Sequence, residues 1–413
     1  MSDFLTSLLG GPVEQKSYSG SFSERAWEII LGGSMSKSGA SITVKNALRV
    51  SAAFSCARVL AEGVAQVPSK LMKEDAGGSV PARWHPQYKV VARKPNDWMT
   101  SFQWRELMMF HAIFAKDGIS VINRVDGSVR ELLPVMPGKV RIEQKPDSSL
   151  IYWVRLHDGV EVPVPRESIF HLRGPSWDGV SGFDVLDIAR EALGLSLATE
   201  ETHARFHQNG AKASGIISMD GELKPEGRAA LKKAFQEQST GENSFKTLVL
   251  DQGAKFSQMS MSGVDGQHLE TRRHQIEEVC RFMRVFPQMA GYSDKTSTFA
   301  SAEQFFIAHV VHSLGPWFER FEQCEDRDLL TEKEIDEGYF HKLPAQGLLR
   351  GDVKSRGEYY TKMYNIGSLN PNEIRALEDM NPYQGGEKYR VPLNMEDPNS
   401  PPDKSKTTTE SQL

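Results

Sequence analysis

Residues 267–330 decide the fold: QHLETRRHQIEEVCRFMRVF (267–286) is followed by AGYSDKTST (290–298) and then by SAEQFFIAHVVHSLGPWFERFEQCEDRDLL (301–330). The first and last of these segments carry apolar residues at helical spacing. The middle segment has few bulky aliphatic residues and many turn formers. We therefore expect two helices joined by a polar loop, with Pro287 ending the first helix.

The last segment predicts an unusually long amphipathic helix. About thirty helical residues would span roughly 45 Å. Gly315-Pro316 lies inside it, and because the apolar stripe continues beyond the proline we expect a kink and not a stop. Such a helix needs partners along its whole length, either in the core of a large α-rich domain or in the lining of a multi-subunit ring. The stripe consists of Ala302, Phe305, Phe306, Val310, Leu314, Trp317, Phe321 and Cys324.

The composition is that of a folded, mildly acidic protein. Its 413 residues exceed one ordinary core, so several structural regions are expected. The net charge of −5 comes without a dominant basic patch of the kind that grips DNA phosphates. Cys56, Cys280 and Cys324 are far apart and odd in number, which indicates buried reduced thiols in a cytosolic setting. We expect no signal peptide, and no apolar run approaches the roughly 20 residues that a bilayer requires.

Upstream of residues 267–330, the expected elements are short. Residues 1–41 are rich in Ser and Gly and are expected to be loose, apart from one short helix near 22–31. The expected order is then a helix from Thr43 to Pro68, a strand with a Gly-Gly turn in 68–80, a helical turn after His85-Pro86, a helix from Phe102 to Ala115 that Thr100 and Gln103 cap and Gly118 stops, and an antiparallel sheet region in 119–173.

Two helical patterns, over 184–209 and 267–285, flank a small α/β insert. Within the insert, SGIISM (214–219), KTLVL (246–250) and AKFSQMSM (254–261) predict strands, and residues 225–238 predict a helix. Beyond the long helix we expect a short strand region near 339–349 and helices over 352–366 and 370–380. Asn370 is the expected cap of the last helix. The Pro-rich polar tail is expected to be disordered.

Signatures of enzyme chemistry are missing from the sequence. It contains neither a phosphate-binding G-x-x-x-x-G-K-[ST] loop nor a G-x-G-x-x-G turn, and no cluster has the spacing of zinc ligands. His309 and His312 could face a metal, although packing or interface roles suit a helix better. The carboxylate pairs Glu277-Glu278 and Asp184/Asp187 have no accompanying base or metal ligand. We expect no cofactor.

Acidic side chains dominate the long helix. Between Ser301 and Thr331 there are six acidic residues and two basic ones. The ordinary interpretation is a solvated helix face. The alternative is the wall of a DNA channel, since an acidic wall repels phosphate and lets DNA slide. The acidic residues are Glu303, Glu319, Glu322, Glu325, Asp326 and Asp328, and the basic ones are Arg320 and Arg327.

Several long strings resemble the portal proteins of tailed bacteriophages, most closely the long-tailed, lambdoid type. Besides residues 267–330, they are HPQYKVVARKPNDWMTSFQWRELMMFHAIF (85–114), the stretch from IFHLRGPSWDGVSG to KASGII (169–217), and the stretch from LLRGDVK to RVPLN (348–394). The resemblance covers about residues 43–395. The chain departs from it at Val285-Phe286-Pro287, where the family often has Val-Pro-Pro, and at Asp117-Gly118-Ile119-Ser120, where it often has Gly-Asn-Ala-Tyr.

The resemblance implies a mainly helical α+β fold of the portal type. Its parts would be a flexible N-terminal segment (1–42), a wing of helices and antiparallel sheet (43–183), two stem helices (184–210 and 265–287), an α/β clip (211–264), a tunnel loop (288–300), a long kinked tunnel helix (301–331), a strand region returning to the wing (332–351), crown helices (352–395) and a disordered tail (396–413).

The resemblance also implies a role without chemistry. The chain would form a homo-oligomeric ring, typically a dodecamer, at one vertex of a capsid built from the major capsid protein. Double-stranded DNA would pass through it, and it would dock first the terminase large subunit and later a head-completion or adaptor protein. Assembly would take place in the host cytoplasm, the product would reside in the virion, and no membrane would be involved.

Three groups of residues are the candidate sites under this interpretation. Gly315 and Pro316 would form the kink of the tunnel helix. The tunnel loop would face DNA, with hydroxyl donors and one mobile cation for weak phosphate contacts; its residues are Ser293, Asp294, Lys295, Thr296, Ser297 and Thr298. The exposed face of the clip helix would bind the partner proteins; its residues are Lys224, Glu226, Arg228, Lys232, Lys233 and Glu237.

Two other classes of protein remain as alternatives. One is a DNA-processing enzyme, such as the nuclease or the motor component of a packaging machine. The missing phosphate-binding loop argues against a motor, and the lack of clustered acidic ligands at strand ends argues against a nuclease. The other is a monomeric scaffold, which the molecular mass in solution would distinguish from a ring.

Overall fold

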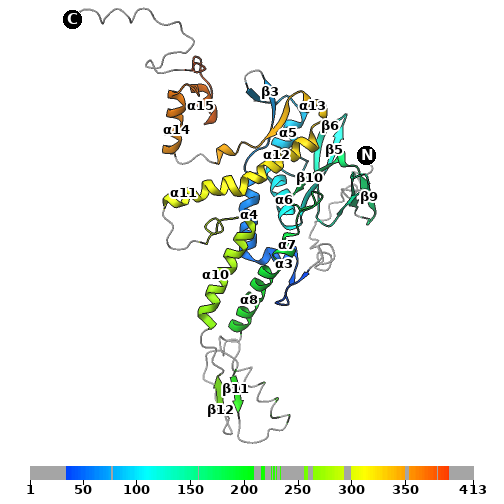
Figure 1. Ribbon diagram of the computed structural model, residues 1–413, viewed down its shortest axis with the longest axis vertical. Coiled ribbons are helices and arrows are strands. Elements are labelled where there is room, and N and C mark those ends of the chain that lie inside the picture. The colour runs from blue at the N-terminus through cyan, green and yellow to red at the C-terminus, as the bar shows by residue number, and fades with distance from the viewer. Residues whose placement is uncertain are drawn as a thin grey trace, which may run out of the picture. The chain divides into compact units, whose positions relative to one another are not determined.

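The computed structural model describes residues 34–75, 78–156, 158–208, 215–218, 255–258, 264–292, 299–348, 353–378 and 380–389, with four single positions between 225 and 233. The chain divides into two compact units, residues 1–345 and 346–413. Figure 1 shows their helices and strands. No helix in the described part of the chain is long and apolar enough to cross a membrane.

The first helical region consists of two helices, not the single helix expected between Thr43 and Pro68. After β1 (Ser34–Met35) and β2 (Ser41–Ile42), the chain forms α3 (Val44–Arg49) and α4 (Ser51–Ala65). Val50 separates them, because its ψ of 107° is extended and not helical. Thr43 does cap the first helix: its hydroxyl accepts a hydrogen bond from the backbone N–H of Asn46.

The helix α6 (Ser101–Phe114) agrees with the predicted Phe102–Ala115 to within one residue at each end. Thr100 and Gln103 form the predicted capping box. The stop at Gly118 is wrong, since the helix ends where Lys116 takes a positive φ of 74°. Gly118 has another role in the following strand. A Cβ there would lie 2.6 Å from the carbonyl oxygen of Met108, so only glycine lets the strand pass this close to α6.

The region 117–173 is antiparallel, as predicted, and divides into two three-stranded sheets. One has the order β10-β5-β6, and the other has the order β7-β8-β9. Their inward side chains form one apolar cluster that includes Val121, Leu133, Tyr152, Val154 and Ile169. The strands are β5 (Asp117–Val125), β6 (Ser128–Val135), β7 (Val140–Gln144), β8 (Leu150–Arg155), β9 (Glu161–Val164) and β10 (Ile169–Arg173).

A third sheet joins two ends of the first unit that are far apart in sequence. Its order is β13-β3-β4, with β13 (Tyr339–Lys342) antiparallel to β3 (Lys70–Asp75) and β3 antiparallel to β4 (Gly78–Pro81). The helices α5 (Pro86–Ala92) and α13 (Glu332–Asp336) accompany this sheet. The strand after the long helix therefore pairs with a strand from the beginning of the unit.

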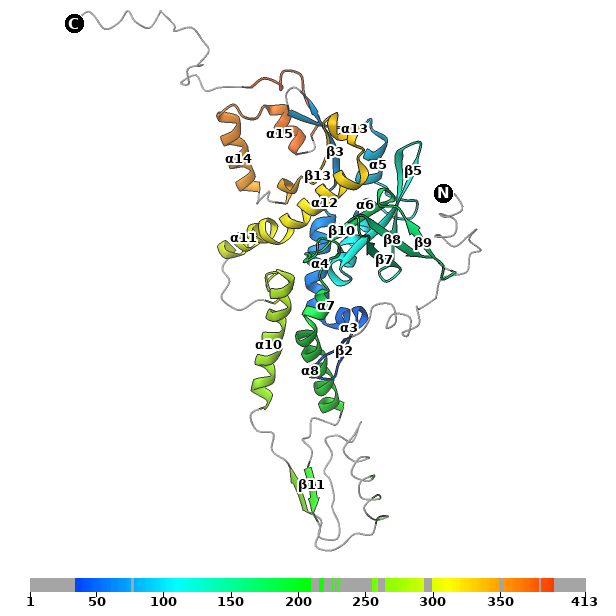
Figure 2. The ribbon, with the colours of Figure 1, turned by 45° about the vertical axis from the view of Figure 1, so that its right-hand side comes forward.

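Two helices flanking the insert lie side by side (Figures 1 and 2). The first is interrupted at Ala189, giving α7 (Val185–Ile188) and α8 (Arg190–Gln208). The second, α10 (Val264–Met283), ends at Arg284, whose φ is 55°, and not at the predicted Pro287. The side-chain amide of Gln275 in α10 donates a hydrogen bond of 3.3 Å to the hydroxyl of Thr199 in α8.

Two of the strands predicted for the insert are confirmed. They are β11 (Gly215–Ser218) and β12 (Lys255–Gln258), and they pair antiparallel. The predicted strand at 246–250 and most of the predicted helix at 225–238 lie outside the described residues. The same holds for the short helix expected near 22–31 and for the C-terminal tail.

The long helix is continuous in hydrogen bonding but not uniform. It consists of α11 (Phe299–Ala308), a π-helical segment (His309–Leu314) and α12 (Gly315–Leu329). Proline cannot donate to the preceding turn, and its ring clashes with the carbonyl four residues earlier. The turn before Pro316 is widened accordingly, with the N–H of Gly315 donating to the carbonyl of Val310. The predicted continuation past the proline is confirmed, and the kink itself stays a prediction.

The second unit contains the two helices predicted near the C-terminus, α14 (Val353–Asn365) and α15 (Pro371–Leu377). Asn370 and Glu373 form a capping box at the start of α15, as its Asn-Pro beginning predicts. The hydroxyl of Tyr360 donates a hydrogen bond of 2.6 Å to Glu378 and ties α14 to the end of α15.

Candidate functional site: the long helix and its buried polar network

The acidic residues of α12 lie against the protein's own core. Glu322, Glu325 and Asp328 are buried, and Asp326 is half-buried. The expectation of a solvated or channel-facing acidic wall is therefore wrong for this half of the helix. Glu319 alone among the acidic residues of α12 is exposed. The side chain of Glu303 lies outside the described residues.

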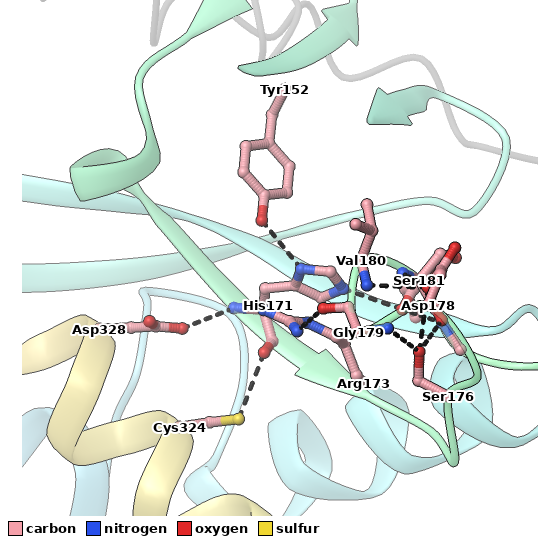
Figure 3. Close-up of polar contacts among 12 residues, drawn as sticks. Tyr152, His171, Arg173, Ser176, Asp178, Gly179, Val180, Ser181, Cys324 and Asp328 are labelled. Atoms are coloured by element: carbon pink, nitrogen blue, oxygen red, sulfur yellow. Dashed lines mark hydrogen bonds and ion pairs between the residues drawn. The ribbon is translucent and has the colours of Figure 1, made fainter. Parts of the chain in front are cut away.

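Asp328 is the point at which α12 is held to the edge strand β10 (Figure 3). Its carboxylate accepts a hydrogen bond of 2.9 Å from the backbone N–H of His171. It also forms ion pairs with Arg166 and Arg327. The backbone carbonyl of His171 accepts from the thiol of Cys324 at 3.3 Å and from Arg327 at 3.0 Å. One residue of β10 thus has both backbone groups bound by α12.

The ring of His171 continues this network in the opposite direction. Its Nδ1 lies 2.9 Å from the hydroxyl of Tyr152, and its Nε2 lies 2.9 Å from Asp117. Asp117 also accepts from the N–H of Gly182 and the hydroxyl of Ser181, as a carboxylate does. The proton therefore sits on Nε2 of a neutral imidazole, and Nδ1 accepts from Tyr152. Burial lowers the pKa of His171, which agrees with a neutral ring.

The hydrogen bonds that link Tyr152, His171 and Asp117 are connected like those of a catalytic relay. The hydroxyl and the imidazole are buried, however, and a substrate could not reach them. Tyr152 and His171 are each 0% exposed. No substrate atom could reach the hydroxyl, which is committed to the imidazole. Within the described ranges, no group of three His, Cys, Asp or Glu side chains could hold a metal ion. We interpret the network as structural, because it joins both sheets to the long helix.

A second buried network binds the other face of α12. The hydroxyl of Ser69 donates to Glu325 at 2.5 Å, and the backbone N–H of Leu343 donates to Glu322 at 2.7 Å. Asp326 accepts from the backbone N–H of His341 at 2.7 Å and lies 2.8 Å from the Nδ1 of the same residue. Burial raises the pKa of Glu325. These contacts fix α12 to β13 and to the residue before β3.

The loop after β10 is held by hydrogen bonds within the loop, several of which Figure 3 shows. Asp178 accepts from the N–H groups of Val180 and Ser181, at 2.8 and 3.0 Å. A Cβ at Gly182 would lie 2.1 Å from the carbonyl oxygen of Lys116, so glycine is required there. Trp177, at the tip, is 89% exposed.

The N-terminal half of the long helix is different, because an apolar face there is exposed to solvent. Phe306, Ile307 and Val311 are 40%, 44% and 49% exposed. Phe305 is half-buried, and its ring lies 5.4 Å from that of Phe286. The predicted apolar stripe is therefore buried from Val310 onward but partly uncovered before it. An exposed apolar face at one end of a helix that is anchored at the other is a candidate surface for association.

The predicted site residues are only partly described. Gly315 and Pro316 lie at the start of α12. The loop residues 293–298 lie outside the described part of the chain, as do Lys224, Glu226, Arg228, Lys232 and Glu237. Lys233 is described and exposed. Sequence reasoning missed His171, Tyr152 and Arg166, and the available signal was the pair of polar residues His171 and Arg173 inside the strand pattern of 168–174.

Comparison with known proteins identifies the family. The family model for the phage portal protein matches residues 51–379. The chain is 30% identical over 403 residues to the probable portal protein of Streptomyces phage phiC31, covering 90% of this chain and 85% of that one. The crystal structure of an HK97 family phage portal protein from Corynebacterium diphtheriae aligns with a TM-score of 0.55 at 16% identity, covering 74% of this chain and 96% of that one.

A similar fold occurs within a ring assembly. A chain from the neck of a native gene transfer agent particle, computed with C12 symmetry, aligns with a TM-score of 0.52 at 19% identity, covering 82% of this chain and 94% of that one. Both structural likenesses show a portal-type fold of helices and sheets. The chain therefore belongs to the phage portal protein family, whose members form a ring at one vertex of the capsid.

Proposed function

We propose that twelve copies of this chain form the ring, and that neighbouring copies cover the exposed apolar face of α11. This face, with Phe306 and Ile307 in α11 and Val311 in the adjoining π-helical segment, is the single observation that carries the proposal. The buried contacts of Glu322, Glu325 and Asp328 hold α12 within its own subunit. The same helix is therefore fixed at its C-terminal end and available for association at its N-terminal end.

In this proposal the parts of the chain have separate tasks. The sheets and helices before Asp184 form the wing, α8 and α10 form the stem, and the insert with β11 and β12 forms the clip. Residues 288–300 form a tunnel loop at the channel, and α14 and α15 form the crown. The C12 symmetry computed for the neck of the gene transfer agent particle supports the number of copies.

The ring would act as a conduit and not as an enzyme. Double-stranded DNA would pass through the channel, the terminase large subunit would dock on the clip during packaging, and a head-completion or adaptor protein would replace it afterwards. The wing would contact the major capsid protein, and assembly would take place in the host cytoplasm. The inaccessible Tyr152–His171–Asp117 relay supports a role without chemistry. The family assignment does not favour the alternative of a nuclease or motor.

Passage of DNA can be tested at the loop. Lys295→Glu replaces the single cation of residues 293–298 by an anion, so weak phosphate contacts summed around the ring should be lost. We expect normal rings and less DNA retained in filled particles, with a larger loss of the same kind on deletion of residues 294–298. Lys145→Glu, in the exposed turn between β7 and β8, is the matched control. Full DNA content in both loop variants would contradict contact between loop and DNA.

A further inference from the structure

Two cysteines that are 224 positions apart in sequence meet inside the first unit. The Sγ of Cys56, in α4, lies 3.6 Å from the Sγ of Cys280, in α10. Their exposed fractions are 0% and 1%. The third cysteine, Cys324, lies elsewhere, with its thiol bound to the carbonyl of His171. All three are free thiols in the structure. The contact is therefore specific to one pair.

We propose that Cys56 and Cys280 form a dithiol site that a small uncharged oxidant, such as hydrogen peroxide, converts to an intramolecular disulfide joining α4 to α10. The two sulfurs are in van der Waals contact, and a disulfide bond of about 2.05 Å requires an approach of roughly 1.5 Å. Both side chains project from helices that pack directly on each other. Closing this gap requires rotation about the side-chain torsions of both residues, which we expect the two helices to allow without a change of fold.

A hydrogen bond within the pair stabilises the first thiolate that forms. The thiol of Cys56 lowers the pKa of Cys280 by hydrogen bonding to it, while the pKa of Cys56 itself is raised. Cys280 therefore becomes the attacking thiolate. It attacks one oxygen of the peroxide, the O–O bond breaks, and hydroxide leaves and takes up the proton that Cys280 lost. The sulfur of Cys56 then attacks the resulting sulfenic acid, the S–O bond breaks, and the proton of Cys56 leaves in a second water. Two thiols and one peroxide give one disulfide and two waters.

The burial of both thiols determines which oxidants can reach them. Charged oxidants cannot enter the interface between α4 and α10, so only small neutral ones can act, and they act slowly. A reducing cell interior keeps the pair as thiols, and the extracellular medium oxidises it once the particle is released. Oxidation after release follows from the place of portal proteins in the virion. The formation of the disulfide itself does not depend on the proposed conduit function. The product would cross-link the proposed wing to the proposed stem.

The test uses the assembled full-length protein, reduced, freed of reductant and treated with hydrogen peroxide. After denaturation in N-ethylmaleimide, mass spectrometry counts the alkylated thiols. We expect three per chain before oxidation and one, Cys324, afterwards, with a peptide linking positions 56 and 280 and a mass lower by two hydrogens. The midpoint of thermal unfolding should rise by roughly 5 °C or more and return to its original value in dithiothreitol.

Single variants separate this pair from other thiol chemistry. Cys56→Ser and Cys280→Ser should each abolish the cross-link and the rise in the unfolding midpoint, and Cys324→Ser should retain both. The peptide map is made on the unaltered protein, so this part of the test does not depend on whether the variants fold. Three alkylated thiols after oxidation, a cross-link involving Cys324 or a second chain, or oxidation of one sulfur without a cross-link would each overturn the proposal. None of these outcomes bears on ring formation, which is measured separately.

Discussion

The carboxylate of Asp328 in α12 lies 2.9 Å from the backbone nitrogen of His171 in β10 and accepts its N–H. β10 is the edge strand of the sheet β10-β5-β6. An edge strand has backbone groups that no neighbouring strand satisfies, and exposed edges invite pairing with other chains. Here the long helix satisfies this edge at His171, where it binds both backbone groups. The contact therefore blocks pairing with another chain at this position and fixes the C-terminal end of the long helix to the sheet.

Removing the carboxylate of Asp328 should lower the free energy of unfolding. Asp328→Ala leaves the buried N–H of His171 without its acceptor and removes the ion pair with Arg166, whose side chain is 25% exposed. Leaving a buried donor unsatisfied typically costs about 1–3 kcal/mol of the free energy of unfolding. Urea unfolding would measure it. Glu319→Ala, at the exposed acidic position of the same helix, is the control and should change stability by less than about 0.5 kcal/mol. Equal effects of the two substitutions would refute the anchoring role.

Stability should fall in mild acid because of His111 in α6. Burial lowers its pKa from 6.5 to about 4, and its Nδ1 has no hydrogen-bond partner among the described residues. Above pH 6.5 both the folded and the unfolded forms are neutral here. As the pH falls, the unfolded chain binds a proton first, so stability is lost progressively between pH 6.5 and 4, by about 3 kcal/mol in total.

His111→Leu should flatten this part of the pH dependence, measured as the unfolding midpoint at pH 7 and at pH 4.5. His274→Leu, at an exposed position of α10, should leave the decline as it is in the unaltered protein. His171 and His309 also have pKa values lowered by burial, so some decline will remain. An unchanged decline in His111→Leu would show that His111 is not a source of it.

Pro316→Ala should allow the widened turn to relax. Alanine supplies the missing N–H and removes the ring, so the segment His309–Leu314 can return to α-helical hydrogen bonding. We expect slower amide hydrogen exchange across this segment. If the predicted kink positions the loop before α11, DNA packaging should also become less efficient. Packaging at the level of the unaltered protein would show that the predicted kink is incidental.

Reversing charge on the predicted clip helix should weaken the docking of the packaging motor. Lys232→Glu combined with Lys233→Glu changes a charged face that can steer a partner and set its rate of association. We expect intact rings that retain less of the terminase large subunit in a pull-down. Lys145→Glu serves as the control. Unchanged retention would remove this face from the interface.

Helix starts were predictable wherever a local signal specifies them. The pairs Thr100–Gln103 and Asn370–Glu373 are such signals, and both capping boxes are present. The breaks at Val50 and Arg284 were not predictable, because neither residue is a turn former. Tertiary packing decides the backbone there, and the periodic pattern runs on through both positions.

The buried networks could not be predicted either, because their partners are distant in sequence. Asp328 meets Arg166 across 162 positions, and Glu325 meets Ser69 across 256. A run of acidic residues in a helical sequence has the same pattern whether the side chains face solvent or face buried hydrogen-bond donors. For the same reason the three cysteines suggested isolated thiols. The family, by contrast, was recognisable from the sequence, because the resemblance extends over several long segments in the same order and does not depend on any single helix end or side-chain contact.

In the proposed closed ring, a neighbouring copy covers the apolar face of α11. Light scattering with negative-stain imaging, at several salt concentrations, tests it most directly on the unaltered chain and on Phe306→Asp combined with Ile307→Asp. We predict rings with a central hole for the unaltered chain, and folded monomers for the double variant. Val80→Asp, at an exposed apolar position of β4, should still form rings. Monomers or dimers of the unaltered chain at every salt concentration, or intact rings in the double variant, would contradict the claim.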